Sequence, residues 1–257
     1  MEYDGSRFLG WQTQPGGGAV QDALEAALAA IAGETIAVSC AGRTDRGVHA
    51  RAQVVHFDTS AERPDSAWVR GVNAMLPEAV AVLWAHRVAP EFHARYGAIS
   101  RSYRYVLLNR PVRPALAARY AGWQHAPLEV EAMREAAGQL LGEHDFSAFR
   151  SAECQAKSAL RTLHSIGIER RGERIDFTLR ANAWLQHMVR NIVGTLVYVG
   201  KGRHAPSWAG SVLESRDRSL AAPTFAAAGL YLEAVEYEPR WNLPSMENRE
   251  IALPLES

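Results

Sequence analysis

The chain has 257 residues, 47% of them hydrophobic and 22% charged, and its 28 basic residues balance its 28 acidic residues. This composition predicts a globular protein of one large domain or two fused subdomains, and it excludes a disordered chain. Cys40 and Cys154 are too few for a disulfide framework, as is typical of a reducing compartment. The start lacks an apolar leader and no run is long enough to span a bilayer, so we expect a cytoplasmic protein without a membrane partner.

The acidic residues are distributed unevenly, although the net charge is zero. Residues 92–128 and 177–213 contain no acid, and residues 35–57 contain only Asp45, yet all three windows contain arginines. If these windows converge in the fold, they form a basic cleft that suits a phosphate backbone. The alternative is a general preference for arginine, since the chain has only two lysines.

The first elements predict a helix between strands. Apolar residues at helical spacing indicate a helix over residues 20–31, which Gly33 ends. Residues 36–40 and 52–57 alternate as strands do. Asp45 therefore lies on the loop that joins two strands.

The surroundings of Asp45 in the sequence are cationic. Five residues of this window can carry positive charge: Arg43, Arg46, His49, Arg51 and His56. Cations favour the charged form of a carboxyl group, which could then act as a nucleophile or base. The alternative is a surface turn in which Asp45 pairs with Arg43 or Arg46.

The middle of the chain predicts a helix over residues 66–76 and strands over residues 79–88 and 98–109. In the last of these strands Tyr103 and Tyr105 share one face and Arg104 lies on the other. The tyrosines could stack on a base, or they could pack in the core. The proline-rich residues 110–114 suggest a boundary between an N-terminal subdomain, residues 1–110, and a C-terminal subdomain, residues 111–257.

The C-terminal half predicts a helix over residues 128–141, a hairpin of strands over residues 163–170 and 174–181, a buried helix over residues 184–199, a short helix over residues 207–214, a strand over residues 229–237 and an extended tail. Arg190 is anomalous on the buried helix, because a buried arginine needs an anionic partner, for which Asp45 is a candidate. Alternatively, Arg190 reaches the surface. The order of elements predicts an α+β fold.

No nucleotide cofactor is indicated, because the chain has neither a Gly-x-Gly-x-x-Gly motif nor a Walker loop. Asp45 and His49 lie four residues apart, but Gly47 argues against a helix and no further metal ligand is evident. We therefore expect no metal and no cofactor.

Five ordered blocks resemble the tRNA pseudouridine synthase A family: Glu2-Tyr3-Asp4-Gly5 with Gly10-Trp11-Gln12, Gly42-Arg43-Thr44-Asp45-Arg46-Gly47-Val48-His49, Phe92-His93-Ala94-Arg95, Tyr103-Arg104-Tyr105, and the block from His187 to Gly194. The resemblance implies two α/β subdomains with mainly antiparallel mixed sheets beside a basic active-site cleft. Two details depart from the family pattern. Arg46 stands where a small residue is usual, and members usually carry more residues before the first block, so we expect a short first strand or a misassigned start.

The resemblance also implies roles for individual residues. Asp45 would be the nucleophile, Tyr103 would pack against the target uracil, and Arg190 would pair with Asp45. Tyr103 would bind the RNA together with four basic residues: Arg43, Arg46, Arg104 and His187. The implied reaction isomerises uridine to pseudouridine on the 3′ side of the tRNA anticodon stem-loop, in a homodimer and without a cofactor. The target base must be flipped out, and Arg43 or Arg46 could fill the space it leaves.

Two other classes of function remain open at this point. A non-catalytic RNA-binding module would share the basic surface. A glycoside hydrolase is disfavoured, because it normally needs two carboxylates and the window around Asp45 has one.

Overall fold

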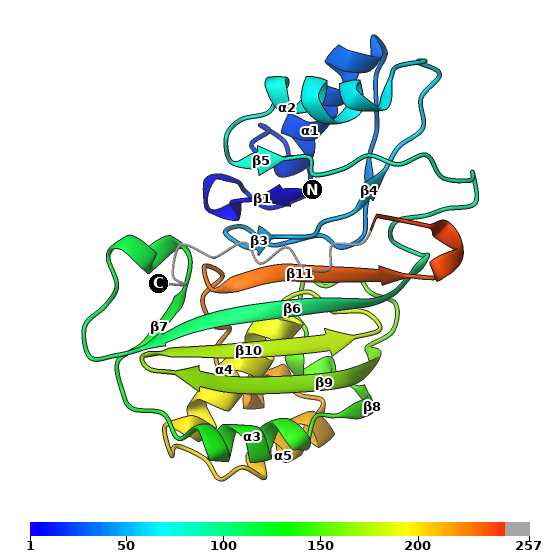
Figure 1. The fold of residues 1–257 in the computed structure, drawn as a ribbon. Helices are drawn as coiled ribbons and strands as arrows, with labels where there is room; N and C mark the ends of the chain where they lie inside the picture. The colour runs from blue at the N-terminus through cyan, green and yellow to red at the C-terminus, as the bar shows by residue number, and fades with distance from the viewer. Residues whose placement is uncertain (245–257) are drawn as a thin grey trace. The chain divides into compact units, whose positions relative to one another are not determined.

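The computed structural model describes residues 1–244, which form two compact units (Figure 1). Unit 1 comprises Met1–Ile99 and the segment that starts at Tyr231, and unit 2 comprises Ser100–Leu230. The expected boundary at residues 110 and 111 differs from this division in two ways. The division of the chain falls within a strand, between Ile99 and Ser100, and the last strand belongs to unit 1 because its residues pair with a strand there. Most of the expected extended tail lies outside the described residues.

Unit 1 is built on short strands. They run in the order β5 (Val80–Ala81), β1 (Glu2–Tyr3), β3 (His49–Ala50) and β11 (Leu230–Tyr237), and β2 (Ser39–Cys40) pairs separately with β4 (Val55–His56). The pairing of β11 with β3 is parallel, and the other pairs are antiparallel.

The strands expected over residues 36–40, 52–57 and 79–88 are thus only two residues long. Side chains and isolated backbone groups satisfy the neighbouring amides instead of a ladder: Val38 N donates to Glu25 Oε1 at 2.9 Å, and Val82 N donates to Asn73 Oδ1 at 2.7 Å. Short apolar runs predict extended chain, but they do not predict which groups pair with it.

The helices of unit 1 are α1 (Val20–Ala32), a π-helical turn η2 (Ala67–Gly71) that continues into α2 (Val72–Met75), and the 3₁₀ turns η1 (Gly5–Arg7) and η6 (Pro239–Trp241). α1 buries Val20, Leu24 and Leu28 and ends at Gly33, whose φ of 80° is left-handed. The helices expected over residues 20–31 and 66–76 are therefore confirmed.

Unit 2 contains the longer strands, in the order β6 (Ala98–Asn109, of which Ser100 onward belongs to this unit), β10 (Arg174–Ala181), β9 (Leu160–Arg171) and β8 (Gly142–Asp145), all antiparallel. β7 (Gly122–Gln124) runs parallel to β6. The expected strand over residues 98–109 and the expected hairpin are confirmed, whereas β7 and β8 had no recognised sequence signal.

Three helices pack together beside the sheet of unit 2 (Figure 1): α3 (Val130–Gly138), α4 (Met188–Gly200) and α5 (Trp208–Ser215). Three 3₁₀ turns join these elements: η3 (Leu116–Arg119), η4 (Ser147–Phe149) and η5 (Arg218–Leu220). α4 is buried along most of its length, as its composition predicts, but it starts four residues later than expected because His187 adopts a left-handed φ of 64°. Among the described residues, no helix has the length and apolar character needed to cross a bilayer.

Candidate active site

Asp45 lies on the loop between β2 and β3, and this loop is held to the N-terminal segment of unit 1. We call residues 41–48 the Asp45 loop. Val48 N donates to the backbone oxygen of Asp45 at 3.1 Å, and Trp11 N donates to that of Thr44 at 2.9 Å. The hydroxyl groups of Thr44 and Tyr3 are 2.8 Å apart. Asp45 itself is half-buried.

Two glycines let the N-terminal segment approach the Asp45 loop closely. A Cβ atom on Gly5 would lie 1.9 Å from the carbonyl oxygen of Val48. Gly10 has a φ of 112°, and a Cβ there would lie 3.0 Å from the oxygen of Thr44 and 3.2 Å from the nitrogen of Arg46. The first sequence block therefore packs closely against the backbone of the loop that carries Asp45.

Gln53 fastens the start of the same loop. Its side chain is fully buried, and its Nε2 donates to Gly42 O at 2.7 Å and to the Tyr3 hydroxyl at 3.3 Å. Gly42 N donates back to Gln53 Oε1 at 3.4 Å. Burial raises the pKa of Tyr3 far above its ordinary value, so this phenol is a neutral hydrogen-bonding group. No local sequence pattern marks Tyr3 or Gln53 as supports, because their bonds join residues 11 to 50 positions apart.

The expected cationic surroundings of Asp45 are only partly present. Arg43 and Arg46 are exposed on the loop. Arg51, in contrast, donates to Glu233 at 2.5 Å. Burial and the neighbouring His93 lower the pKa of His56, which favours its neutral form.

His49 is the first residue of β3, and its side chain is buried. Its Nδ1 lies 3.2 Å from both Gly5 N and Asp4 Oδ1, and its ring stacks on Tyr231 at 4.7 Å. Three of the five expected cations thus have partners of their own. Because proximity along the chain does not fix the direction of a side chain, the charge around Asp45 stays a prediction.

In unit 2, Tyr103 and Tyr105 share one face of β6, as expected, and both are buried. Tyr103 is 7% exposed and meets the ring of Trp184 edge to face at 5.6 Å. Tyr105 is fully buried, and its hydroxyl donates to Ala226 O at 2.9 Å. The core alternative is therefore right for Tyr105.

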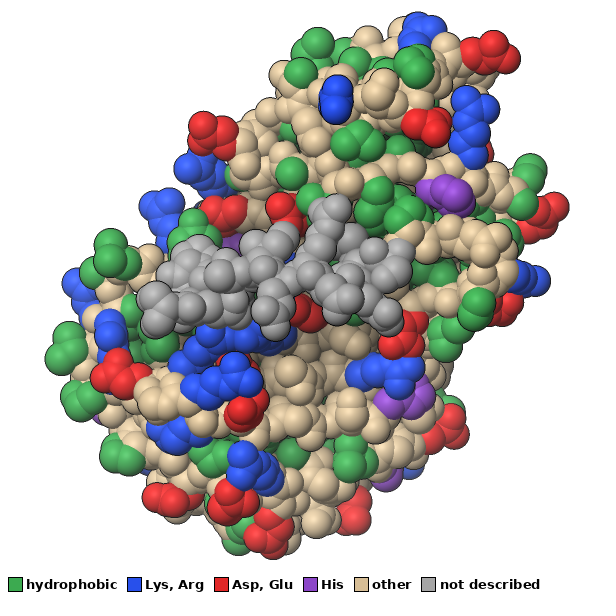
Figure 2. All heavy atoms as spheres, in the orientation of Figure 1, with side chains coloured by type: hydrophobic (Ala, Val, Ile, Leu, Met, Phe, Trp, Pro, Cys, Tyr) green, Lys and Arg blue, Asp and Glu red, His purple; other side chains and the backbone are tan. Residues whose placement is uncertain are grey.

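Arg104 is engaged in an ion pair on the other face of β6. Its Nε lies 3.3 Å from Asp176 Oδ1, and the Nε of Arg174 lies 2.9 Å from Asp176 Oδ2. Asp176 is 5% exposed, so these charges neutralise one another in a partly buried place. Figure 2 shows basic and acidic side chains interspersed over the face of unit 2 that is in view. A role for Arg104 in binding RNA stays a prediction.

His187 and Arg190 lie at the start of α4. His187 is half-buried and its carbonyl oxygen accepts from Asn191 N at 2.9 Å. Arg190 is also half-buried, and its Nε donates to Phe225 O at 2.8 Å. The structure thus groups Asp45, Arg43 and Arg46 on one loop of unit 1, and it places Tyr103, Arg104, His187 and Arg190 in unit 2. Pairing of Arg190 with Asp45 stays a prediction.

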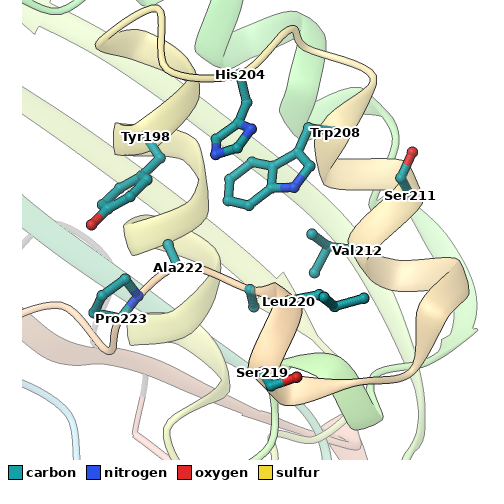
Figure 3. Close-up of a pocket in the computed structure, with 10 residues that line it drawn as sticks. Tyr198, His204, Trp208, Ser211, Val212, Ser219, Leu220, Ala222 and Pro223 are labelled. Carbon is teal, nitrogen blue, oxygen red and sulfur yellow. The ribbon is translucent and has the colours of Figure 1, made fainter.

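A separate hollow of about 540 Å³ lies among α4, α5 and the segment from Ser219 to Pro223 (Figure 3). The rings of His204 and Trp208 stack there with centroids 3.7 Å apart. None of the expected site residues lines it. Within residues 1–244, no group of three His, Cys, Asp or Glu side chains is placed to hold a metal ion.

Known proteins with similar sequences cover nearly the whole chain. A family model described as tRNA pseudouridine synthase matches residues 1–97 and 136–238. The tRNA pseudouridine synthase A of Dechloromonas aromatica is 58% identical over 244 residues, which are 95% of this chain and 93% of that protein. The enzyme of the same name from Aromatoleum aromaticum is 58% identical over 254 residues, 99% of this chain and 96% of that protein.

A solved structure of a Cbf5-Nop10-Gar1 complex aligns with 90% of this chain and 50% of the matched chain, with 10% identity and a TM-score of 0.39, a likeness too weak to carry an argument. The relatives above match nearly the whole chain, and the two segments that the family model matches contain four of the five blocks, all but Tyr103-Arg104-Tyr105. On this evidence, and with the α+β fold that the family resemblance implies, the chain belongs to the tRNA pseudouridine synthase family.

Proposed function

We propose that this chain isomerises uridine in tRNA to pseudouridine, with the carboxylate of Asp45 as the nucleophile. The observation that carries the proposal is the Asp45 loop, whose backbone is fastened by Trp11 and Gln53 and whose Thr44 hydroxyl is bonded to Tyr3, while Asp45 stays half-buried. A reactive group held by a rigid support is pre-organised for attack. Membership of the family gives the reaction class.

The reaction exchanges one bond for another within the same nucleotide. The bond from the sugar to a uracil nitrogen breaks, and a bond from the sugar to a uracil carbon forms as that carbon loses its proton. Asp45 would attack the anomeric carbon, remove a sugar proton or add to the uracil ring, and Tyr103 would accept the proton or stack on the base. Arg190 would pair with Asp45.

We further propose that the target uridines lie on the 3′ side of the anticodon stem-loop. A base in a stem has to leave the stack before it can react, and the exposed Arg43 and Arg46 on the loop of Asp45 could fill the space. Arg104 and His187 would contact the RNA. A non-catalytic binding module is less well supported, because it gives no reason for the fastened carboxylate loop.

The decisive experiment replaces Asp45 with Asn. This change keeps the shape but removes the nucleophilic oxygen and the charge, so we expect pseudouridine formation to vanish while tRNA binding persists. Radiolabelled tRNA is incubated with the protein and a chelator, without nucleotide cofactors, and its nucleosides are separated. Asp65→Asn is the matched control, because Asp65 is strongly exposed and its nearest cation, Arg87, lies 4.0 Å away.

Each outcome has a definite meaning. Product from the wild type and from Asp65→Asn, but none from Asp45→Asn, supports the proposal. A wild type that forms no pseudouridine on any tRNA pool would favour the binding module. Full activity of Asp45→Asn would show that another group is the nucleophile.

We also propose that the protein acts as a cytoplasmic homodimer. Large apolar side chains are exposed on the segment between β6 and β7 and on β7, with Val112 73%, Leu116 96% and Trp123 36% exposed, as suits a surface that a second copy covers. Sedimentation should give twice the chain mass of 28.2 kDa. Leu116→Asp should then give a monomer and Leu160→Asp, at another exposed leucine of unit 2, should not; a monomeric wild type would refute the proposal.

A further inference from the structure

Arg190 is held by the segment that follows η5. We call residues 221–226 the clamp loop. Two hydrogen bonds join it to Arg190, one from Arg190 Nε to Phe225 O at 2.8 Å and one from Phe225 N to Arg190 O at 3.3 Å. The first bond restricts rotation of the guanidinium group, because Nε is part of its plane. The position of the clamp loop therefore sets where the head of Arg190 points.

A polar network fixes the clamp loop to α4. The hydroxyl of Thr224 donates to Asn191 Oδ1 at 2.7 Å, and Arg218 Nη2 donates to both of these oxygens at 3.1 Å. Asn191 is fully buried, and its Nδ2 donates to Phe149 O at 2.7 Å. The amide of Asn191 is thus tied to η4 on one side and to the clamp loop on the other.

Both ends of the clamp loop have a further contact. Arg218 Nη1 donates to Ala221 O at 3.4 Å, and the buried hydroxyl of Tyr105 donates to Ala226 O. Gly194 of α4 lets the loop lie against the helix, since a Cβ there would lie 2.5 Å from Pro223 O.

The first residues of the clamp loop border a hollow. Ala221, Ala222 and Pro223 line the hollow of about 540 Å³ described above (Figure 3). A segment beside a hollow has fewer van der Waals contacts on that side, so its position depends more strongly on its hydrogen bonds. The network around Thr224 is therefore well placed to decide the position of Phe225.

We propose that Thr224, Asn191 and Arg218 are positioning residues, which orient Arg190 through the clamp loop. The inference rests on the proposed function, in which Arg190 acts on Asp45. None of the three needs to touch the substrate. Their effect on the reaction passes through the bond between Phe225 O and Arg190 Nε.

The sharpest test is Thr224→Val, which preserves shape and removes only the hydroxyl group. A small displacement of Arg190 weakens its interaction in the transition state, so we expect kcat to fall about tenfold while KM for tRNA changes less than about twofold. Thr224→Ser restores the hydroxyl and should restore kcat. Thr162→Val is the matched control, because Thr162 is also half-buried and its hydroxyl also donates to a side chain, that of Glu143 on the neighbouring strand β8.

A double-mutant cycle separates positioning from a general loss of stability. In an Arg190→Lys background the Nε donor is absent, so Thr224→Val should lower kcat no further. Thermal unfolding of each variant reports on the fold. An undiminished kcat for Thr224→Val would overturn the inference, as would a loss of the same size in the Arg190→Lys background.

The failure of this inference can be told from failure of the proposed function. If the wild type forms pseudouridine and Thr224→Val is equally active, only the positioning role is refuted. If the wild type forms no pseudouridine, the proposed function is refuted, and the inference, which rests on it, is refuted as well.

Discussion

Gly10 shows how much one missing side chain matters to the Asp45 loop. Gly10→Ala should combine backbone strain at a φ of 112° with contacts to Thr44 O and Arg46 N at 3.0 and 3.2 Å. We expect a loss of unfolding free energy of about 1–3 kcal/mol, measured by urea unfolding, and a larger relative loss of kcat because the loop must shift.

Gly16→Ala is the matched control for this change. Gly16 has a similar φ of 99°, but a Cβ there would meet no atom within 4 Å. The Gly16→Ala variant has the same kind of backbone strain without a contact to the Asp45 loop, so its kcat should stay near that of the wild type. Equal losses of kcat in the two variants would show that Gly10 has no specific bearing on Asp45.

At single positions, the sequence points to the proposed nucleophile more clearly than to the residues that support its loop. Asp45 stands out because it is the only acid between Glu34 and Asp58. Thr224 and Arg218 have no comparable signal, because they meet Asn191 only after the chain turns back on α4. Asn191 itself was detectable in principle, as a polar residue on an apolar helix that must find partners when buried.

Among the elements, length decided how well the sequence predicted the structure. β6 matches its expected range of residues 98–109, and β10 and α1 agree within a residue or two, because each has many residues with one period. β2, β4 and β5 have two residues each, since their neighbours bond to side chains or to isolated backbone groups. β7 has three residues and depends on its parallel pairing with β6, which no local pattern encodes.

β4 carries a histidine whose protonation should weaken unit 1. The backbone amide of Ala94 donates to His56 Nδ1 at 3.1 Å, a bond that requires this nitrogen to be unprotonated. Burial, followed by the neighbouring His93, lowers the pKa of His56 below its ordinary value of 6.5. The unfolded chain then takes up a proton that the folded chain resists, so stability is full above the ordinary value and falls as the pH drops below it.

The measurement is the unfolding free energy between about pH 7 and pH 5, the range in which histidines ordinarily titrate. His56→Asn keeps an acceptor near Ala94 N but does not titrate, so its stability should fall less steeply with acid than that of the wild type. His125→Asn, at an exposed histidine, serves as the control and should follow the wild type. An unchanged slope for His56→Asn would mean that the bond to Ala94 does not contribute to the pH dependence.

For the whole molecule, a zero net charge does not prevent binding to a polyanion. Arg113 and Arg203 lie in windows without acids and have exposed side chains. Arg104 also lies in such a window, but its side chain is paired with Asp176. Each contact between an arginine and a phosphate releases counterions. We therefore expect the Kd for tRNA to rise at least about a hundredfold between about 50 and 200 mM salt.

Single substitutions can assign this salt dependence to residues. Arg113→Ala and Arg203→Ala should each reduce the slope of log Kd against log salt by about one, the value for one lost phosphate contact. Arg87→Ala, at an exposed arginine 4.0 Å from Asp65, should leave it unchanged. An affinity for tRNA that does not vary with salt would contradict an electrostatic mode of binding.

The return of β11 to unit 1 gives the order of synthesis a role in folding. A ribosome completes Ser100–Leu230, the whole of unit 2, before it adds the strand that pairs with β3. Until then Arg51 lacks Glu233, His49 lacks the ring of Tyr231, and the backbone amides of Arg51 and Ala52 lack the carbonyl of Leu232. Asp45, the proposed nucleophile, is thus translated early, but the contacts of His49, Arg51 and Ala52 on the chain just after its loop are completed only when β11 emerges.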